Sequence, residues 1–120
     1  MAGASNHPED FLPLSPSQFY ILLVLAEHDL HGYGIMQSVK IRTKGRIRIG
    51  PGTLYSAIDR MIERGWIVET DSLQPNQDDE RRRTYHLTDF GMRVARAEAQ
   101  RLAATVQDAR ELGLLTKFAF

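Results

Sequence analysis

The sequence predicts a mainly α, α+β fold: a small helical domain that carries a β-hairpin and continues into a long carboxy-terminal helix. Three observations support this fold class. Apolar residues recur at helical spacing in three segments before residue 65. Two short runs rich in β-branched and aromatic residues flank a polar stretch, as in a hairpin. A helical pattern without proline then extends from residue 88 to residue 112.

The composition fits one soluble domain with a modest core. The chain has 120 residues, of which 42% are hydrophobic and 25% charged, and it has no cysteine. The lack of cysteine excludes disulfides, a thiol nucleophile and a cysteine-based zinc site. No run approaches the roughly 18 apolar residues of a membrane span, and the first ten residues lack a secretory pattern. We therefore expect a cytoplasmic protein without a membrane partner.

The first helix is expected after a loose amino-terminal arm. Residues 1–13 are polar, contain proline and show no apolar period, so we expect a flexible or loosely docked arm. Ser15 can cap a helix whose first residue is Pro16, and this helix extends to Asp29. Its apolar residues at helical spacing are Phe19, Leu22, Leu23 and Ala26.

A short second helix and a very short strand are expected next. The turn at residues 31–33 leads into a helix with an inner stripe of Ile35, Met36 and Val39, which lies before the basic residues that begin at Lys40. Residues 46–49 then alternate polar and apolar side chains, which is typical of a strand with both isoleucines facing inward.

The third helix has the clearest pattern in the chain. It begins at Pro51 and ends at Gly65, a typical carboxy-terminal cap. Its inward residues follow the i, i+3, i+4, i+7, i+8 pattern and are Leu54, Ala57, Ile58, Met61 and Ile62. Residues 66–70 and 84–87 predict two strands of a hairpin, and Trp66 is expected in the core.

Thr88 can cap the last helix, which carries a heptad seam. The helix is too long to bury this seam on the domain that it leaves, and the small alanines favour close packing against another helix. A second copy of the chain is the simplest partner, so we expect a homodimer. The seam residues are Met92, Ala95, Ala99, Leu102, Val106 and Ala109.

This order of elements is that of a winged helix-turn-helix, whose third helix enters the major groove of DNA. We therefore divide the chain into the arm (1–13), a winged-helix domain (14–87) and a dimerisation helix with its tail (88–120). When the inward residues of the third helix face the core, Thr53, Ser56 and Arg60 lie on the opposite face and Tyr55 on the flank. These side chains can bond bases or phosphates. A solvated helix face is the alternative, favoured by Asp59 and Glu63.

The charges are sorted along the chain although the net charge is zero. Residues 1–39 contain four acids and no Lys or Arg, whereas residues 40–64 contain seven bases and two acids. A few such bases suffice for phosphate anchoring, although a charge run is also typical of a solvated face. The bases that precede the third helix are Lys40, Arg42, Lys44, Arg46 and Arg48. Arg81, Arg82 and Arg83 leave the hairpin tip, where a wing can touch the flanking groove or the DNA backbone. Alternatively, the preceding acids at 78–80 neutralise these arginines.

Five motifs follow one another along the chain. They are His31-Gly32-Tyr33-Gly34-Ile35, Gly50-Pro51-Gly52-Thr53-Leu54-Tyr55, Gly65-Trp66-Ile67, the arginine-rich hairpin tip and Tyr85-His86-Leu87-Thr88. Together they resemble the PadR family of transcriptional regulators over residues 14–112. The resemblance implies a winged-helix dimer that represses genes by occupying operator DNA, with a small molecule or cellular stress relieving repression. By position, Tyr33, Thr53, Tyr55 and Ser56 resemble the family's DNA-facing residues, and Arg82 and Arg83 its basic wing. The chain departs from the family at Gly34, at Thr84 and in its acidic wing tip.

The other function classes have less support. The histidines at 28, 31 and 86 form no pattern of nucleophile, base and orienting group, so we expect no enzyme, no metal and no cofactor. A winged helix that binds only proteins is the main alternative, and the basic segment argues against it. The sequence thus predicts a DNA-binding regulator that recognises a pseudo-palindromic operator as a homodimer. Its effector class is left open.

Overall fold

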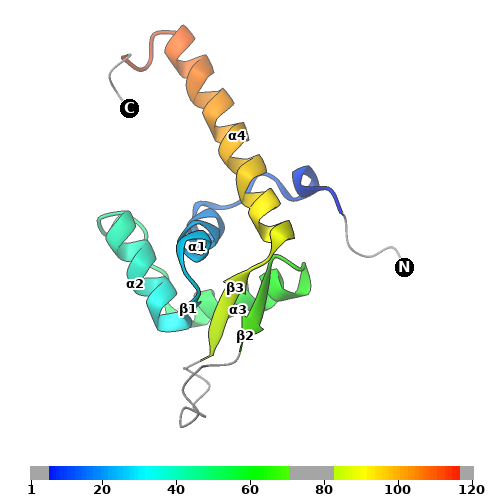
Figure 1. The fold of residues 1–120 in the computed structure, drawn as a ribbon. Helices are drawn as coiled ribbons and strands as arrows, with labels where there is room; N and C mark the ends of the chain where they lie inside the picture. Colours follow the sequence, from blue (N-terminus) through cyan, green and yellow to red (C-terminus); the bar gives the residue numbers. More distant parts are fainter. Residues whose placement is uncertain (1–5, 71–82, 117–120) are drawn as a thin grey trace.

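A computed structural model describes residues 6–70 and 83–116 of the chain. Figure 1 shows a small body of helices around a short sheet, with one long helix that leaves the body. The predicted mainly helical winged helix-turn-helix fold is confirmed. The elements are η1 (Pro8–Phe11), α1 (Pro16–Glu27), β1 (Leu30–His31), α2 (Gly32–Arg42), α3 (Pro51–Glu63), β2 (Ile67–Thr70), β3 (Thr84–Leu87) and α4 (Asp89–Glu111).

The sheet has the antiparallel order β1-β3-β2. In β2 and β3, Ile67 pairs with Leu87 and Thr70 with Thr84, as expected for the predicted hairpin. The other edge is β1, in which Leu30 pairs with Tyr85. Sequence patterning missed β1 because two residues are too short to show a period of two. Its pairing nevertheless ties the turn before α2 to the hairpin.

The strand predicted at residues 46–49 is wrong, because this segment forms a turn and an irregular connection between α2 and α3. The alternation still has a packing consequence: Ile49 is buried and Ile47 half-buried. The fully buried Thr43 organises the connection. Its Oγ1 donates to the Val39 carbonyl oxygen at 2.9 Å and accepts from the Ile47 N–H at 3.0 Å.

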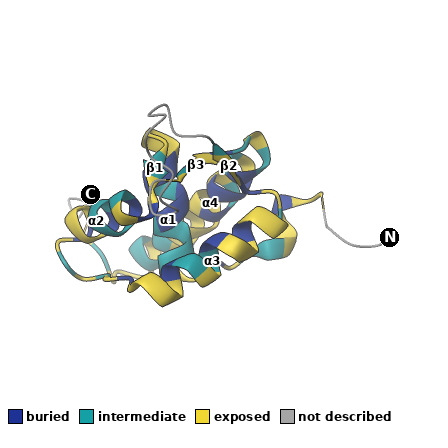
Figure 2. Ribbon diagram, turned by 90° about the horizontal axis from the view of Figure 1, so that it is seen from below, coloured by how far each residue is buried: buried dark blue, intermediate teal, exposed yellow. Residues whose placement is uncertain are grey.

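The core lies between the helices and one face of the sheet, where Figure 2 shows the buried positions facing inward. Trp66 is fully buried, which confirms its predicted core position. The α1 face was predicted only in part. Ile21 and Val24 are buried although the predicted stripe omitted them, whereas Ala26 is exposed. Other fully buried core residues are Leu22, Ile35, Val39, Leu54, Met61, Ile67 and Val94.

Local capping explains where two helices begin. The Ser15 side chain accepts a hydrogen bond from the Gln18 N–H, and the Gln18 side chain accepts one from the Ser15 N–H, which completes a capping box. The Thr88 hydroxyl accepts from the Gly91 N–H and caps α4, as predicted. The same hydroxyl donates to the Trp66 carbonyl oxygen at 3.0 Å. This contact fixes the junction between the hairpin and α4.

The first half of α4 packs on its own domain, which corrects the predicted seam. Ala95 is buried and Met92 packs against the core, so these two seam residues already have contacts within the chain. Beyond Glu98 the helix leaves the domain and its side chains become largely exposed, including Leu102. The part of the seam that extends past the domain therefore begins at Ala99.

The predicted loose arm is wrong for its second half. The 3-10 helix η1 packs on α4, and Pro8 is buried there. The Phe11 ring lies edge-on to Trp66, with ring centroids 5.3 Å apart, and to Phe90, with centroids 6.1 Å apart. Residues 1–5 lie outside the described part of the chain. In the described ranges 6–70 and 83–116, no helix has the length and hydropathy to cross a membrane.

Candidate nucleic-acid interface

The exposed face of α3 presents a row of polar side chains. Thr53, Ser56 and Arg60 are exposed, whereas Leu54 and Ile58 on the opposite face are buried in the core. This division follows the predicted helical geometry, except that Ile62, which was predicted to face inward, is 39% exposed. The Arg60 guanidinium offers several donors and the two hydroxyls can donate or accept. The row therefore has the chemistry needed to bond base edges and phosphate oxygens.

An open groove of about 800 Å³ lies between the start of α1 and the polar row of α3. Sequence reasoning did not assign Ser17 and Gln18 of α1 to a site, but they line this groove opposite α3. Their signal is weak, since two polar residues in a first helical turn are also typical of capping. The lining residues are Ser15, Ser17, Gln18, Gly52, Thr53, Ser56, Ala57 and Arg60.

The amino end of α3 exposes bare backbone. Gly50 is the N-cap and makes no side-chain cap, and Pro51 occupies the first turn. The first intrahelical bond recorded there is from the Leu54 N–H to the Gly50 carbonyl oxygen, at 2.9 Å. The preceding N–H groups have no acceptor within the helix. In the described part of the chain, apart from the adjacent residues and the backbone of α3 itself, no heavy atom lies within 4 Å of where a Cβ would stand at Gly50 or Gly52, so an anion can approach these donors closely.

Tyr55 braces α3 against α2. The side chain is half-buried, and a Cβ at Gly32 would overlap its hydroxyl group. Its position on the flank of α3 agrees with the sequence expectation, but much of the ring packs against the protein. Tyr33, one residue after Gly32, is 66% exposed at the amino end of α2. The structure therefore brings the start of α2 and the start of α3 together through Gly32 and Tyr55.

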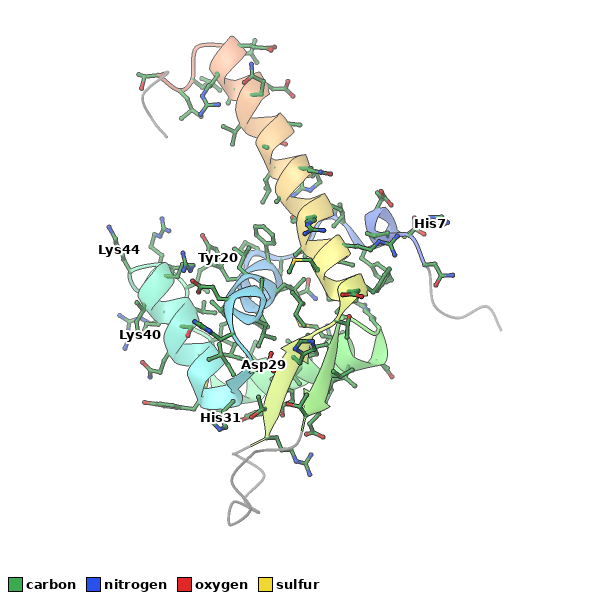
Figure 3. All side chains as sticks on the ribbon, in the orientation of Figure 1. His7, Tyr20, Asp29, His31, Lys40 and Lys44 are labelled. Atoms are coloured by element: carbon green, nitrogen blue, oxygen red, sulfur yellow. The ribbon has the colours of Figure 1, made fainter. Side chains whose placement is uncertain are left out.

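The basic residues before α3 differ in how far they are engaged. Arg42 pairs with Glu27 at 3.2 Å, and the Arg46 Nε donates to the Thr43 carbonyl oxygen at 3.1 Å. Lys40 and Lys44 are exposed and, among the described residues, have no recorded acidic partner. Figure 3 shows Lys40 on α2 and Lys44 just past the end of the helix opposite His31. The free ammonium groups thus lie toward the carboxyl end of α2, away from Tyr33.

The arginine that precedes β3 pairs with an acid on the neighbouring strand. Arg83 precedes β3 and donates to Glu69 of β2 at 3.0 Å. Its charge is therefore shared with an acid on the neighbouring strand. Arg81 and Arg82, together with acids 78–80, lie outside the described residues. The predicted wing contacts rest on sequence alone for this reason.

Two titratable side chains of β3, His86 and Tyr85, have structural contacts. Within residues 6–70 and 83–116, no group of three or more His, Asp or Glu side chains is placed to hold a metal ion. The His86 Nδ1 lies 2.8 Å from the Asp29 Oδ1, which joins β3 to the loop after α1. Burial raises the pKa of the Tyr85 hydroxyl above its usual 10.0, and nearby Glu69 raises it further. Tyr85 is thus a neutral core residue at physiological pH.

The chain is similar to transcriptional regulators. The model of the transcriptional regulator PadR-like family matches residues 21–97. An uncharacterized 37.1 kDa protein in a transposon of Streptomyces fradiae is 31% identical over 87 residues, which are 72% of this chain. The match spans only 23% of that relative's length.

Two solved structures share the fold. A transcriptional regulator from Clostridium thermocellum has a TM-score of 0.66 at 24% identity, covering 91% of this chain and 99% of the other. A PadR family transcription regulator from Clostridium difficile has a TM-score of 0.66 at 22% identity, covering 82% of this chain and 98% of the other. At these identities the similarity supports the fold.

Proposed function

Because the chain belongs to the PadR-like family of transcriptional regulators, we propose that it is a sequence-specific repressor that binds operator DNA as a homodimer. The polar row of α3 reads base edges in the major groove, and the surrounding backbone and basic groups hold phosphates. A small-molecule or stress signal relieves the repression. Regulation through DNA binding is common to the family; the operator contacts, the dimer and the signal are the content of the proposal.

The exposed row Thr53, Ser56 and Arg60 is the observation that carries the proposal. These side chains stand on the helix that a winged helix-turn-helix inserts into the major groove. Arg60 can pair with a guanine through two donors, while Ser56 and Thr53 can bond a base or a phosphate. Bare backbone at Gly50 and Gly52 supports close contact with a phosphate at the start of the same helix.

The charge pattern around α3 favours DNA over a protein partner. Lys40 and Lys44 are exposed and pair with no acid among the described residues, and Arg46 and Arg48 are exposed beside them. Such bases release counterions when they meet phosphates, which gives an affinity that falls with salt. In this arrangement Tyr55 is a brace between α2 and α3 that also presents part of its ring edge to the duplex.

The second half of α4 supports the homodimer. Ala99 and Leu102 are exposed on the helix beyond the domain, and Leu112 and Leu114 are 77% and 75% exposed near its end. Packing against a second α4 buries these apolar surfaces and places two α3 helices about one turn of DNA apart. A signal that shifts one α4 against the other changes this separation and weakens operator binding.

Selection from a random pool of duplexes tests the proposal although the operator sequence is unknown. The purified chain is incubated with the pool, bound duplexes are amplified and sequenced, and the result is compared with the DNA upstream of its own gene. We expect an imperfect palindrome with half-sites about one helical turn apart. Failure to enrich any sequence would overturn sequence-specific reading and leave the protein-interaction module as the better function.

A further inference from the structure

A charged side chain is buried where α4 leaves the domain. Glu98 is 1% exposed, and with Thr43 it is one of two buried polar residues in the described part of the chain. Its Oε1 accepts from the Arg101 Nε, and its Oε2 accepts from the Arg101 Nη2 at 2.8 Å. Because removing a carboxylate from water costs free energy, Glu98 can be buried at this junction only when hydrogen bonds and an opposite charge compensate it.

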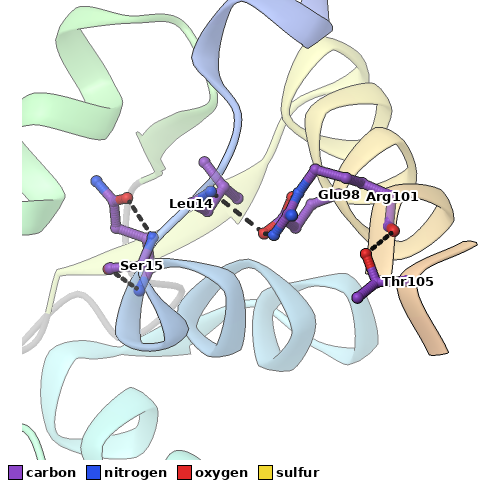
Figure 4. A network of polar contacts seen from close by, with 6 residues as sticks. Leu14, Ser15, Glu98, Arg101 and Thr105 are labelled. Carbon is purple, nitrogen blue, oxygen red and sulfur yellow. Dashed lines mark hydrogen bonds and ion pairs between the residues drawn. The ribbon is translucent and has the colours of Figure 1, made fainter. Parts of the chain in front are cut away.

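The partner outside α4 is the backbone just before α1. The Leu14 N–H donates to the Glu98 Oε2 at 3.2 Å, a contact between residues 84 positions apart in the chain (Figure 4). Leu14 itself is buried beside Ser15, the N-cap of α1. One carboxylate therefore joins α4, Arg101 and the start of α1. A fully paired buried group of this kind favours one relative position of the elements that it connects.

The same amino-terminal segment also contacts the carboxyl end of α3, through Phe11. Phe11 lies edge-on to Trp66, and the Arg64 guanidinium lies over the Phe11 ring at 5.7 Å from its centroid. Arg64 is the C-cap residue of α3, and Pro8 is buried where η1 packs on α4. Residues 8–14, here called the strap, thus contact both the helix that carries the polar row and the helix that leaves the domain.

We propose that the strap sets the angle between α3 and α4 and thereby determines which half-site spacing the dimer accepts. The two positioning residues are Phe11 on the strap and Glu98 on α4, which holds the strap through the Leu14 N–H. The inference rests on the proposed function for its effect on DNA, whereas its mechanical part concerns one chain alone. A change of angle at Glu98 is carried along the rest of α4, so it alters the separation of the two α3 helices. Release of either anchor leaves α4 free to adopt other angles.

A distance measurement within one chain tests the mechanical part. The protein has no cysteine, so Glu63→Cys on α3 and Ala104→Cys on α4 accept two spin labels at exposed positions. An excess of unlabelled chain isolates the distance within one protomer, and pulsed electron paramagnetic resonance gives its distribution. We expect one narrow population for the parent. Glu98→Gln and, separately, Phe11→Leu each add a second, displaced population.

The matched control is Glu111→Gln, which changes an exposed carboxylate on the same helix that accepts from Gln107. It should reproduce the parent distribution. Circular dichroism confirms that each variant is folded, and Phe11→Leu keeps the test decisive when Glu98→Gln does not fold. An unchanged distance distribution in the folded variants would overturn the proposed role of the strap.

A library in which the selected half-sites flank spacers of different length tests the effect on DNA. The parent should bind one spacer more tightly than the others. In Glu98→Gln and Phe11→Leu, the ratio of the affinities for the preferred spacer and the other spacers should fall about tenfold, as expected for a typical coupling between distant sites. A displaced α4 with an unchanged spacer preference overturns the inference for DNA while leaving the proposed function intact. A parent that selects no sequence overturns the proposed function instead, and the distance measurement still decides the strap.

Discussion

Two glycines occupy positions where an added Cβ would overlap a neighbouring residue. A Cβ at Gly32 would overlap the Tyr55 hydroxyl, and a Cβ at Gly91 would overlap the Trp66 carbonyl oxygen. The first contact joins α2 to α3, and the second joins α4 to the start of the hairpin. Tyr55 can rotate away from an added methyl group, but the Trp66 backbone cannot. Gly91 is therefore the stricter requirement.

Gly91→Ala is expected to lower the free energy of unfolding by roughly 1–3 kcal/mol, because the new methyl group forces α4 away from the Trp66 backbone. Urea denaturation followed by circular dichroism measures this change. Gly52→Ala is the control, since its added Cβ meets no described atom within 4 Å beyond the adjacent residues and the α3 backbone, and alanine favours a helix. Equal stability of Gly91→Ala and the parent would show that this contact relaxes without cost.

The pKa of Glu98 predicts how the stability of the fold depends on pH. Hydrogen bonds from Arg101, aided by the Leu14 N–H, hold the pKa of Glu98 below its usual 4.5, although burial opposes them. A carboxyl group with a lowered pKa stabilises the fold at pH values above its unfolded pKa, and this contribution is lost as pH falls through the folded pKa.

The stability difference between the parent and Glu98→Gln is therefore expected to be larger at pH 7 than at pH 3.5. Urea denaturation at both pH values measures it, with Glu111→Gln as the exposed control. A difference that stays constant over this range would contradict the paired, ionised state of Glu98.

At the scale of elements, the sequence placed the four described α-helices and the hairpin strands, but it missed β1 and predicted a strand at residues 46–49 that does not form. α3 was recognisable because its apolar residues and Gly65 describe a complete amphipathic helix with its cap. The alternation at residues 46–49 has the local pattern of a strand, but no strand in the described part of the chain pairs with it. Pairing is a long-range property, so the true edge strand β1 is defined only by the position of β3 beside it.

The candidate site was predictable to the same extent. Helical geometry alone placed Thr53, Ser56 and Arg60 on the exposed face of α3. It could not find the groove wall from α1, because that wall depends on how two helices pack. The strap was missed for the same reason, since Phe11 meets Trp66 only after the chain has folded. Glu98 was passed over because a charge within a helix is usually solvated.

The dimer prediction belongs to α4. Leu102→Asp combined with Val106→Asp is expected to convert the protein to a monomer, because two carboxylates would be buried between the helices without partners. Light scattering after size-exclusion chromatography measures the mass. Ala104→Asp combined with Gln107→Asp places the same charges on the other side of the helix and should leave the dimer intact. A dimer that persists in the first variant and binds operator normally would contradict the α4 seam.

At the scale of the whole molecule, function depends on how the charges are distributed. The net charge is zero, yet residues 40–64 carry seven bases and two acids and include α3 and the connection before it. The body supplies a polar row and exposed lysines, while α4 leaves the body as the candidate dimerisation element. In the proposed function, this division assigns base reading, phosphate anchoring and half-site spacing to different elements. Each task can therefore be removed by a different substitution.

The central claim is that α3 reads bases while the lysines before it hold phosphates. Fluorescence anisotropy tests this claim most directly. It compares binding to the selected operator with binding to a scrambled duplex, at two salt concentrations. Arg60→Ala is expected to lose discrimination between the duplexes, at a cost of about 1–3 kcal/mol on the operator. Lys44→Ala should weaken both duplexes alike and lower the salt dependence. Arg96→Ala, exposed on α4, is the control. Unchanged discrimination in Arg60→Ala, with binding equal to the parent on both duplexes, would contradict the account.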